Sequence, residues 1–576
     1  MKRILALVMA LVLLVGMFPA GAAAEQSEEK REYTFYLGDP DETLEAPFPV
    51  YFLDGVDDLP YLEMDDMLNL LVFLNQDCMG DDGYKLSCEY NYTKVTVKRE
   101  NGYSVTFDFD KGTITFDDYD AFQHSSNDTT LIDLLSETGF DENGQAQLFQ
   151  RDKEKSFDRY GDMKTFNLND YGIKMEIRGE QYFIPMQTVS DIFVAPALGF
   201  SLLFNGQALF AASDDLFFDY GEGAYTPLSE LYYEAAPTQR SDALSEYSYN
   251  ELCMVLDNLY GLKGPHDINT FAETFWQIGI DEALRSNNPT DADNALKMFI
   301  DYYLDDLHSV FDEYSWMAGK QDISNSTGMA NRKIREHGDA YGEARAAKYP
   351  DGVPAYEEVG NTAYITFDSF DSRYIGQAYY TETEDGQAPD DTIALIIHAH
   401  EQITRPDSPI ENVVLDLSNN LGGAVDAAIF VLGWMLGDAP FSVKNMSTGA
   451  MSTSVYRADV NLDRRFDDSD TVADKHLYCL ISPVSFSCGN LVPNALKSSQ
   501  KVTLLGRTSG GGSCTVQSLS TAYGTVFQIS SSKRMSFLKN GSFYDIDQGI
   551  DPDYYINDIA NFYDREALTE YINGLF

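Results

Sequence analysis

The chain has 576 residues, too many for one hydrophobic core, and a typical domain size of about 150 residues suggests on the order of three or four structural units. Hydrophobic residues make up 44% of the sequence, which is enough to fill such cores. The formal net charge of −52 argues against a nucleic-acid partner and against binding to anionic membranes.

The first 24 residues have the features of a secretory signal. Two basic residues precede an apolar run at 4–18, and a stretch of small residues follows at 21–24. The run is short for a transmembrane helix, and no later stretch is long and apolar enough to cross a bilayer. We therefore expect a secreted protein, extracellular or cell-wall associated, with a mature chain that begins near Glu25.

Residues 25–238 show the alternation of apolar and polar residues that indicates strands joined by polar turns. Strands are expected at 33–37, 95–98, 104–109 and 113–116. The fragments 50–74 and 173–203 both contain a strand, a proline and then an apolar helical run, which suggests a weak internal repeat. Since no catalytic constellation falls in this region, we interpret it as accessory modules.

The next two regions differ in their periodicity. Apolar residues recur at helical spacing between 240 and 318, so 239–352 is predicted to be a helical unit, with its polar segment 319–352 as a loop or lid. From 353 to 576 strands alternate with helices, which favours an α/β unit with a largely parallel sheet. The expected fold class is thus a multidomain α+β protein with a C-terminal α/β core.

Three segments of the α/β region carry the residues of chemical interest. The strand at 413–417 runs into a turn that ends in Gly422 and Gly423, where unpaired backbone N–H groups point outward. The strand ending at Ile481 is followed by Ser482 and Ser485, then by Ser487, Cys488 and a helix. The third strand, 502–506, leads into a glycine-rich stretch that ends at Cys514. Taken alone, each is compatible with a tight turn that binds nothing.

In this order, the three segments resemble the signature blocks of the tail-specific (C-terminal processing) and tricorn-core serine peptidases. The resemblance implies a crotonase-like, ClpP-like core in which Ser487 is the nucleophile, and Gly422, Gly423 and Cys488 supply an oxyanion hole. Ser482 and Ser485 are expected to be structural caps. Asn490 stands where relatives often have Glu.

The general-base lysine of the tail-specific branch is missing, because its place is taken by Gly512. A serine hydroxyl needs a neighbouring base. His308, in the segment 304–309, resembles the base of tricorn-like relatives, and an imidazole titrates near neutral pH. The supporting carboxylate should precede the closing segment 549–553, where Asp547 is preferred and Asp545 is the alternative.

The six cysteines and one acidic loop suggest further features. Cys78 and Cys88 fit a hairpin clip, and a disulfide between Cys488 and Cys514 would hold the glycine-rich loop against the site. One acidic loop has the ligand spacing of an EF-hand-like calcium loop, although Arg464 replaces the usual Gly. Its ligands would be Asp459, Asn461, Asp463 and Asp470. The alternative interpretation is a solvated acidic loop that binds no metal.

These features predict a secreted serine endopeptidase that hydrolyses protein or peptide substrates through a Ser487 acyl-enzyme with His308 as the base. No cofactor is required for this chemistry, and no nucleic-acid partner or membrane insertion is expected. The alternative, motivated by the missing lysine, is a catalytically degenerate peptidase fold that binds extracellular peptides or a surface partner. A glycosidase using paired Asp residues has only the general acidity in its favour.

Overall fold

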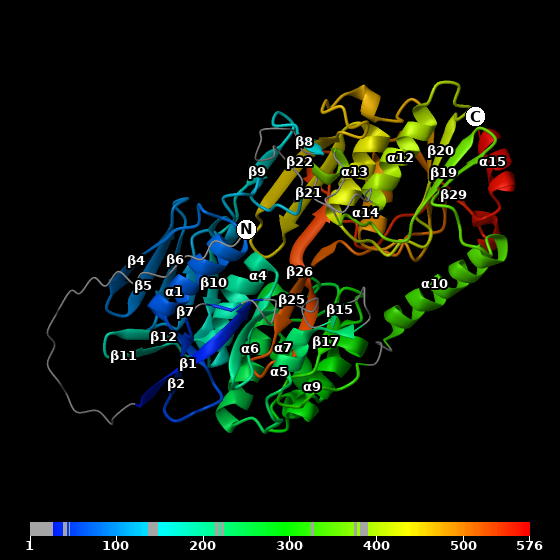
Figure 1. Cartoon of the computed structure of the whole chain (residues 1–576). Coiled ribbons are helices and arrows are strands. Elements are labelled where there is room, and N and C mark those ends of the chain that lie inside the picture. Colours follow the sequence, from blue (N-terminus) through cyan, green and yellow to red (C-terminus); the bar gives the residue numbers. More distant parts are fainter. Residues whose placement is uncertain are drawn as a thin grey trace.

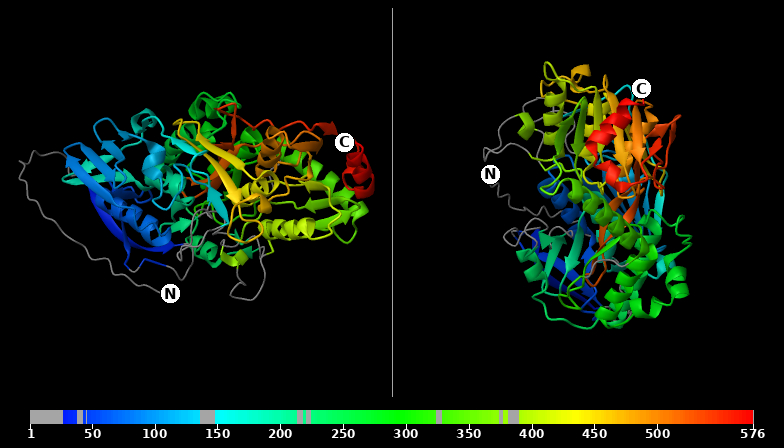
Figure 2. Two further views of the ribbon diagram at one scale, coloured as in Figure 1. Left: turned by 90° about the horizontal axis from the view of Figure 1, so that it is seen from above. Right: turned by 90° about the vertical axis from the view of Figure 1, so that its right-hand side faces the viewer.

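The computed structural model describes residues 27–575, except 38–42, 45, 136–147, 213–217, 220–223, 324–327, 374–376 and 381–389. The predicted signal segment, 1–24, lies outside the described residues. The molecule has one lobe built from the N-terminal half and another built from the C-terminal α/β region (Figures 1 and 2). No helix within these ranges is long and apolar enough to span a membrane.

The N-terminal region consists mainly of antiparallel strands, as its alternating pattern predicts. One sheet has the order β11 (Glu176–Arg178), β12 (Gln181–Pro185), β3 (Tyr61–Glu63), β2 (Phe48–Leu53), β1 (Glu28–Leu37), β14 (Ala208–Ala212) and β13 (Ser201–Phe204). A second has the order β10 (Lys164–Asn167), β7 (Thr113–Phe116), β6 (Ser104–Asp108), β5 (Lys94–Arg99) and β4 (Leu86–Asn91). The pair β15 (Phe218–Asp219) and β16 (Ala224–Tyr225) stands apart.

The two fragments of the suspected repeat have the same order of elements and lie side by side. In each, a short strand runs directly into a helix: β3 into α1 (Met64–Phe73) and η1 (Leu74–Cys78), and β12 into α3 (Met186–Val189), η3 (Ser190–Val194) and α4 (Ala195–Leu198). The strands β3 and β12 pair antiparallel, and the Met186 amide donates to the Pro60 carbonyl over 2.9 Å. The short α2 (Tyr119–Gln123) and η2 (Leu168–Tyr171) complete the region.

The predicted helical unit is present. It contains α5 (Pro227–Tyr232), α6 (Asp242–Leu259), α7 (Phe271–Ile278), α8 (Asp281–Leu284), α9 (Pro289–Met298) and η5 (Phe299–Leu304). The side chains of Ser241, Thr270 and Asn288 cap the longer helices by accepting backbone N–H groups of the first turn. The last element, η5, has Asp305 as its C-cap, and the turn that contains His308 follows directly.

An antiparallel sheet joins the predicted regions to one another. Its order is β17 (Val310–Glu313), β26 (Val526–Ser536), β21 (Ala439–Asn445), β22 (Met451–Ala458) and β8 (Phe149–Arg151), with β25 (Cys514–Ser520) on β26 and β9 (Phe157–Arg159) on β22. Strands from the accessory region, the helical unit and the core therefore share one sheet. Strands on either side of the boundaries expected near 238 and 353 thus belong to the same sheet, because β-pairing acts between residues far apart in sequence.

The C-terminal core is an α/β unit, as predicted. Its sheet has the order β18 (Tyr356–Val359), β19 (Thr362–Thr366), β20 (Asn412–Asp416), β23 (His476–Ile481), β24 (Val502–Gly506) and β29 (Tyr554–Tyr555), and every pair from β19 onward is parallel. The helices α12 (Thr392–Thr404), α13 (Val425–Leu436) and α14 (Cys488–Ser498) cover one face. The other face carries η7 (Ile559–Phe562) and α15 (Arg565–Asn573). Smaller elements are α11 (Gln377–Tyr380), η6 (Asp468–Asp470), β27 (Leu538–Lys539) and β28 (Ser542–Phe543).

The expectation of a loop or lid at 319–352 is wrong for most of its length. Residues 329–348 form a helix, α10 (Met329–Lys348), which crosses from the helical unit to the core lobe (Figure 1). Only Tyr341 of this helix is buried, so the sequence lacks the apolar stripe by which an amphipathic helix is recognised. Its stability comes from contacts at its two ends, which a periodicity argument does not detect.

A buried carboxyl pair links the accessory region to the helical unit and makes the docking sensitive to pH. Asp191 in η3 and Glu251 in α6 are 0% and 2% exposed. Gln187 donates to one Asp191 oxygen and Thr188 to one Glu251 oxygen, both over 2.9 Å, while the other oxygen of each carboxyl has no donor among the described residues. Burial raises the pKa of both groups, and the Glu251 charge raises the pKa of Asp191 further.

We expect the free energy of unfolding to fall as the pH rises from about 5 to about 8. A raised folded-state pKa means that the folded protein holds a proton that the unfolded chain releases, and this costs about 1.4 kcal/mol per pH unit while the difference persists. Urea midpoints should show the decline in the wild type and a flatter profile in Glu251→Gln. An unchanged slope in Glu251→Gln would contradict this assignment.

A second buried pair holds the end of β20. Arg565 in α15 contacts Asp416 over 2.6 Å, with side chains 2% and 0% exposed, and the other Asp416 oxygen accepts the Ser418 amide over 3.0 Å. Asp416→Ala should lower the free energy of unfolding by about 3–5 kcal/mol, because Arg565 would stay buried without a counter-charge. The exposed pair Lys348–Asp564 is the control, and Lys348→Ala should cost no more than about 1 kcal/mol in the same urea titration.

Candidate active site

Ser487 lies between the end of β23 and the start of α14, with a backbone that side-chain-bearing residues rarely adopt. Its φ is 54° and its ψ is −122°. Strain of this kind costs about 1–3 kcal/mol and is concentrated at functional sites. Ser487 occupies the N-cap position, yet its hydroxyl makes no capping hydrogen bond, so the oxygen is available at the helix N-terminus.

The neighbouring serines are structural, as predicted, although they cap no helix. The Ser482 and Ser485 hydroxyls donate to the Ser418 and Leu417 carbonyls over 2.5 and 2.7 Å. Both side chains are fully buried. They fix the approach of the serine loop to the turn that follows β20, and of the three serines Ser487 is the one whose hydroxyl remains uncommitted.

The turn after β20 packs directly against Ser487. Gly422 has a φ of 107°, and a Cβ there would lie 2.7 Å from the Ser487 Cβ and 3.1 Å from the Cys488 nitrogen. Only glycine permits both this backbone and this approach. The Phe486 amide donates to the Asn420 carbonyl over 3.1 Å, which joins the two loops. The two segments predicted to build an oxyanion hole are therefore adjacent in space.

The backbone donors of these loops are not equivalent. The Gly422 amide donates to the Asn420 side-chain oxygen over 2.9 Å and is thus already occupied. The Cys488 and Gly423 amides have no acceptor among the described residues, and Gly423 is exposed. The arrangement leaves Cys488 and Gly423 as the ready donors. The side chain of Asn420, which the sequence interpretation did not single out, sets this difference.

His308 follows a strained turn at the end of the helical unit. Leu307 has a φ of 70°, and Asp306 accepts the backbone amides of His308 and Ser309 over 3.1 and 2.6 Å. The imidazole packs on the ring of Phe486, the residue before Ser487, with a centroid distance of 4.6 Å. Across about 180 positions of sequence, the fold brings the histidine to the serine loop.

No hydrogen bond joins the His308 imidazole to the Ser487 hydroxyl within the described part of the chain. The imidazole is largely buried, which lowers its pKa below the usual 6.5, and the carboxylates of Asp306 and then Asp547 oppose this shift. His308 is therefore neutral at neutral pH, the form that can accept a proton. Catalytic hydrogen bonds are often long before substrate binds, so the present geometry is compatible with a base that moves onto the hydroxyl.

The two carboxylates expected to support His308 have different surroundings. Asp547 accepts the Ser513 amide and hydroxyl, each over 3.1 Å, and acts on the pKa of His308 through its charge. Asp545 instead pairs with Arg534 over 2.5 Å. Asp306 also acts on the His308 pKa and precedes Asp547 in strength. The sequence contained Asp306 in the motif around His308, but only the fold reveals how many backbone groups it holds.

The position of the missing lysine is filled by an aromatic ring. Gly512 has a φ of 84°, and a Cβ there would lie 2.5 Å from the Phe486 ring. A lysine at 512 would thus meet both backbone strain and a clash. Asn490 is fully buried and joins the helix to neighbouring loops, because it donates to the Ile546 carbonyl over 2.9 Å and accepts the Ser509 hydroxyl over 2.8 Å.

The model of peptidase family S41 matches residues 361–556. This segment of the chain is thus similar to peptidase family S41. The S41 segment contains Ser487, the Gly422 turn and Asp547, whereas His308 lies outside it. The match supports a serine peptidase that acts on proteins or peptides.

Solved structures with similar folds include other peptidases. The photosystem II D1 C-terminal processing protease is 17% identical with a TM-score of 0.25, covering 35% of this chain and 45% of its own. A lipoprotein from Streptococcus agalactiae is 14% identical with a TM-score of 0.34, covering 58% and 98%. The tricorn protease is 10% identical with a TM-score of 0.29, covering 85% and 46%. The chain spans less than half of the processing and tricorn proteases. No curated protein sequence matches it.

No disulfide joins any of the six cysteines within the described residues, so neither suggested disulfide is present. Cys488 packs in the core of the S41 segment, whereas Cys514 packs in the hydrophobic cluster of the N-terminal lobe. The two thiols therefore lie in different cores although both flank the site. Burial raises the pKa of each to about 12, which disfavours a thiolate.

The carboxylates of the predicted calcium loop are bound to the loop backbone. Asp459 accepts the Arg464 amide over 2.8 Å, and Asp470 accepts the Val460 and Asn461 amides over 2.8 and 3.1 Å. The Asn461 and Asp463 side chains accept amides two residues further on. No group of three or more His, Cys, Asp or Glu residues in the described ranges is arranged to hold a metal ion. Calcium at this loop stays a prediction.

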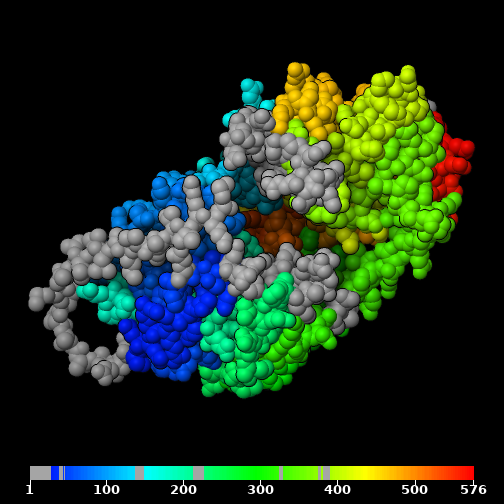
Figure 3. All heavy atoms as spheres, in the orientation of Figure 1, coloured from blue at the N-terminus to red at the C-terminus, as the bar shows by residue number. Residues whose placement is uncertain are grey.

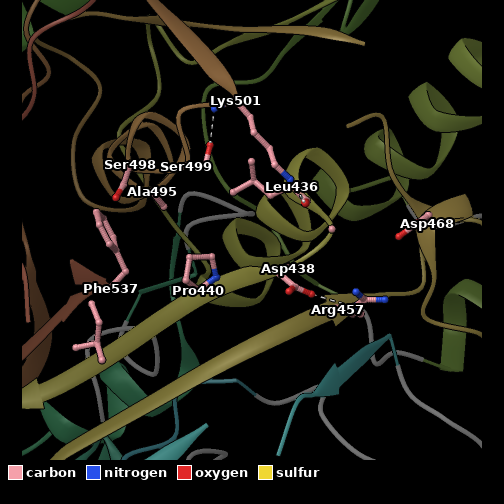
Figure 4. A pocket seen from close by; sticks show the side chains of 12 residues that line it. Leu436, Asp438, Pro440, Arg457, Asp468, Ala495, Ser498, Ser499, Lys501 and Phe537 are labelled. Carbon is pink, nitrogen blue, oxygen red and sulfur yellow. Dashed lines mark hydrogen bonds and ion pairs between the residues drawn. The ribbon is translucent and has the colours of Figure 1, made fainter. Parts of the chain in front are cut away.

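A cavity of about 350 Å³ lies at the opposite end of α14 from Ser487 (Figure 4). Its two cations are already engaged, because Arg457 pairs with Asp438 over 2.9 Å and Lys501 donates to the Leu436 carbonyl over 3.3 Å. None of the candidate catalytic residues lines it. The cavity is thus separate from the candidate active site of the S41 segment.

Proposed function

We propose that this chain is a secreted serine endopeptidase with Ser487 as nucleophile and His308 as general base. The observation that carries the proposal is the strained Ser487 backbone at the start of α14, with an uncommitted hydroxyl and Gly422 packed against it. A nucleophile held in this way is exposed to a substrate carbonyl and lies in the positive field of the helix N-terminus.

The reaction follows from the residues that surround Ser487. The neutral imidazole of His308 takes the hydroxyl proton while the oxygen attacks the scissile carbonyl carbon. The amides of Cys488 and Gly423 donate to the resulting oxyanion. His308 then gives its proton to the leaving amine as the peptide C–N bond breaks. Water, deprotonated by the same imidazole, attacks the acyl-enzyme, and the ester bond to Ser487 breaks as His308 returns the proton to the Ser487 oxygen. Asp547 and Asp306 stabilise the imidazolium through their charges. Side chains and backbone amides carry every step without a cofactor.

The alternative is a degenerate peptidase fold that binds peptides without cleaving them. It is favoured by one observation, the absence of a His308–Ser487 hydrogen bond among the described contacts. A fluorophosphonate probe separates the two functions, because it bonds covalently only to an activated serine. We expect peptide mapping by mass spectrometry to place the label on Ser487. A folded protein that is not labelled would rule out the hydrolytic function and leave the binding function.

Secretion rests on the basic and apolar composition of the first 24 residues. If the signal is cut as proposed, the protein recovered from the medium of a Gram-positive host expressing the full sequence begins near Glu25. Retention in the cytosol with an intact N-terminus would contradict it.

A further inference from the structure

Helix α10 connects the turn before His308 to the region around Asp368, on two sides of the candidate active site. At its start, Asp305, three residues before His308, accepts the Ala330 and Asn331 amides over 2.6 and 3.1 Å. Near its end, the Arg345 guanidinium donates two hydrogen bonds to the Asp368 carboxylate, over 2.7 and 2.8 Å. The helix is therefore anchored to the turn that carries the proposed base.

The Asp368 anchor leads directly to the loop that carries Gly422. The Asp368 side chain accepts from Asn419 over 3.2 Å, and its carbonyl accepts the Leu421 amide over 3.2 Å. The helix thus runs from the loop of the proposed base to the loop that carries Gly422. In Figure 3 a hollow opens between the lobes, with orange atoms at its floor and the green atoms of α10 on its right.

Several side chains in the first half of α10 are exposed to solvent. Met329 is 73% exposed, and Arg332 and Lys333 are also exposed. A helix that is polar all round gains little from packing, so its position depends on the two anchors. A surface held rigidly beside a candidate active site, but not covered by the rest of the described chain, is available to contact a substrate.

The charge of this surface is opposite to that of the protein. The chain has 40 Lys and Arg against 92 Asp and Glu, yet residues 329–335 contain three basic residues and no acidic one. No ion pair joins Arg332 or Lys333 to another described residue, whereas Arg345 and Lys348 pair with Asp368 and Asp564. The surface therefore keeps the charge of Arg332 and Lys333.

The glycine-rich side of the site adds to this positive field. Burial lowers the pKa of His337, and the charges of Lys333 and Arg507 lower it further. Arg507 follows β24 and precedes the glycine-rich loop that contacts Ser487. The Debye length is about 8 Å at physiological salt, so the charges nearest to this surface, those of Lys333, Arg507 and the opposing Glu336, act on it more strongly than distant charges.

We propose that the N-terminal half of α10, residues 329–338, docks an acidic segment of the peptide substrate beside the scissile bond. This inference rests on the proposed function, since it assigns the substrate class of the same site. Arg332 and Lys333 would attract the carboxylates, and the exposed Met329 would contact the apolar parts of the same segment. Charge complementarity of this kind acts on encounter and register more than on chemistry.

The test measures peptide binding to the full-length Ser487→Ala protein, so that it does not depend on cleavage. One fluorescent peptide carries a run of Asp and Glu, and its partner carries Asn and Gln at the same positions. We expect the acidic peptide to bind at least about 10-fold more tightly at low salt and to lose this advantage near 1 M salt. Equal dissociation constants for the two peptides would overturn the inference.

Charge-reversal variants locate the effect. In the Ser487→Ala background, Arg332→Glu with Lys333→Glu should weaken the acidic peptide about 10-fold and leave the amide peptide unchanged. The matched control, Lys30→Glu with Lys98→Glu, changes the net charge equally at exposed lysines of β1 and β5. If the control weakens binding as much, the effect belongs to total charge and the docking surface is rejected. The new glutamates lie in the first turns of α10, where the helix dipole favours them, so folding is preserved.

The failure of this inference is distinguishable from failure of the proposed function. A wild-type enzyme that cleaves both peptides with equal kcat/KM overturns acidic docking and leaves the peptidase intact. A protein that binds the acidic peptide selectively but is neither labelled by fluorophosphonate nor hydrolytic loses the enzymatic function while the docking surface stands.

Discussion

Ser487→Ala should abolish peptide hydrolysis, lowering kcat by a factor of about 10⁴ to 10⁶ with little change in the binding of substrate. The Ser487 Oγ is the atom that would carry the acyl group in the acyl-enzyme. No other group within the described loops replaces it, since the Ser482 and Ser485 hydroxyls donate to backbone carbonyls. Steady-state kinetics on a quenched fluorescent peptide measures the loss. A residual rate within tenfold of the wild type would exclude Ser487 as the nucleophile.

The control for this variant is Ser498→Ala, at the other end of the same helix. It removes the same atom about 11 residues away without altering the N-terminus of α14, so kcat and fluorophosphonate labelling should both stay within about twofold of the wild type. Equal loss in both variants would point to damage of the helix rather than of the nucleophile. Urea midpoints for the two proteins separate these causes.

His308→Gln should lower kcat/KM by about 10³ to 10⁴ and change the shape of the pH profile. Burial holds the pKa of His308 below 6.5, so the wild type should lose activity as the pH falls through that lowered pKa and the imidazole becomes protonated. Above it, the base form dominates and the rate should be level. The glutamine variant has no such group, and its residual rate should lack this acid limb.

Two carboxylate variants refine the prediction. Asp547→Asn removes a charge that raises the pKa of His308, so its acid limb should move to lower pH and kcat should fall, because the imidazolium is less stabilised. Asp545→Asn removes a partner of Arg534 and should leave the limb in place. A shift with Asp545→Asn and none with Asp547→Asn would reverse their assignment. If His308→Gln keeps the acid limb of the wild type, His308 is not the base.

Local sequence determined the parts of the site that depend on neighbouring residues. The Asn-Leu-Gly-Gly segment and the serine-containing segment before a helix could be placed as strand-to-helix turns, because turn geometry and helix starts are set by a few adjacent side chains. The role of Ser487 as nucleophile is inferred from the resemblance to a peptidase family, not from these turns alone. The alternation of Ala363 and Ile365 on one face with Tyr364 on the other likewise follows from strand period.

The fold alone decided the features that depend on residues distant in sequence. The helix α10 has no apolar stripe and is anchored by Asp305 and Asp368, so no periodic pattern predicted it. The Phe486 ring occupies the space of a base at 512 and supports the His308 ring, and Asn420 occupies the Gly422 amide. Composition and spacing show which side chains the protein has and which residues are adjacent in sequence. Contacts between residues hundreds of positions apart form only when the hydrophobic cores pack and exclude water.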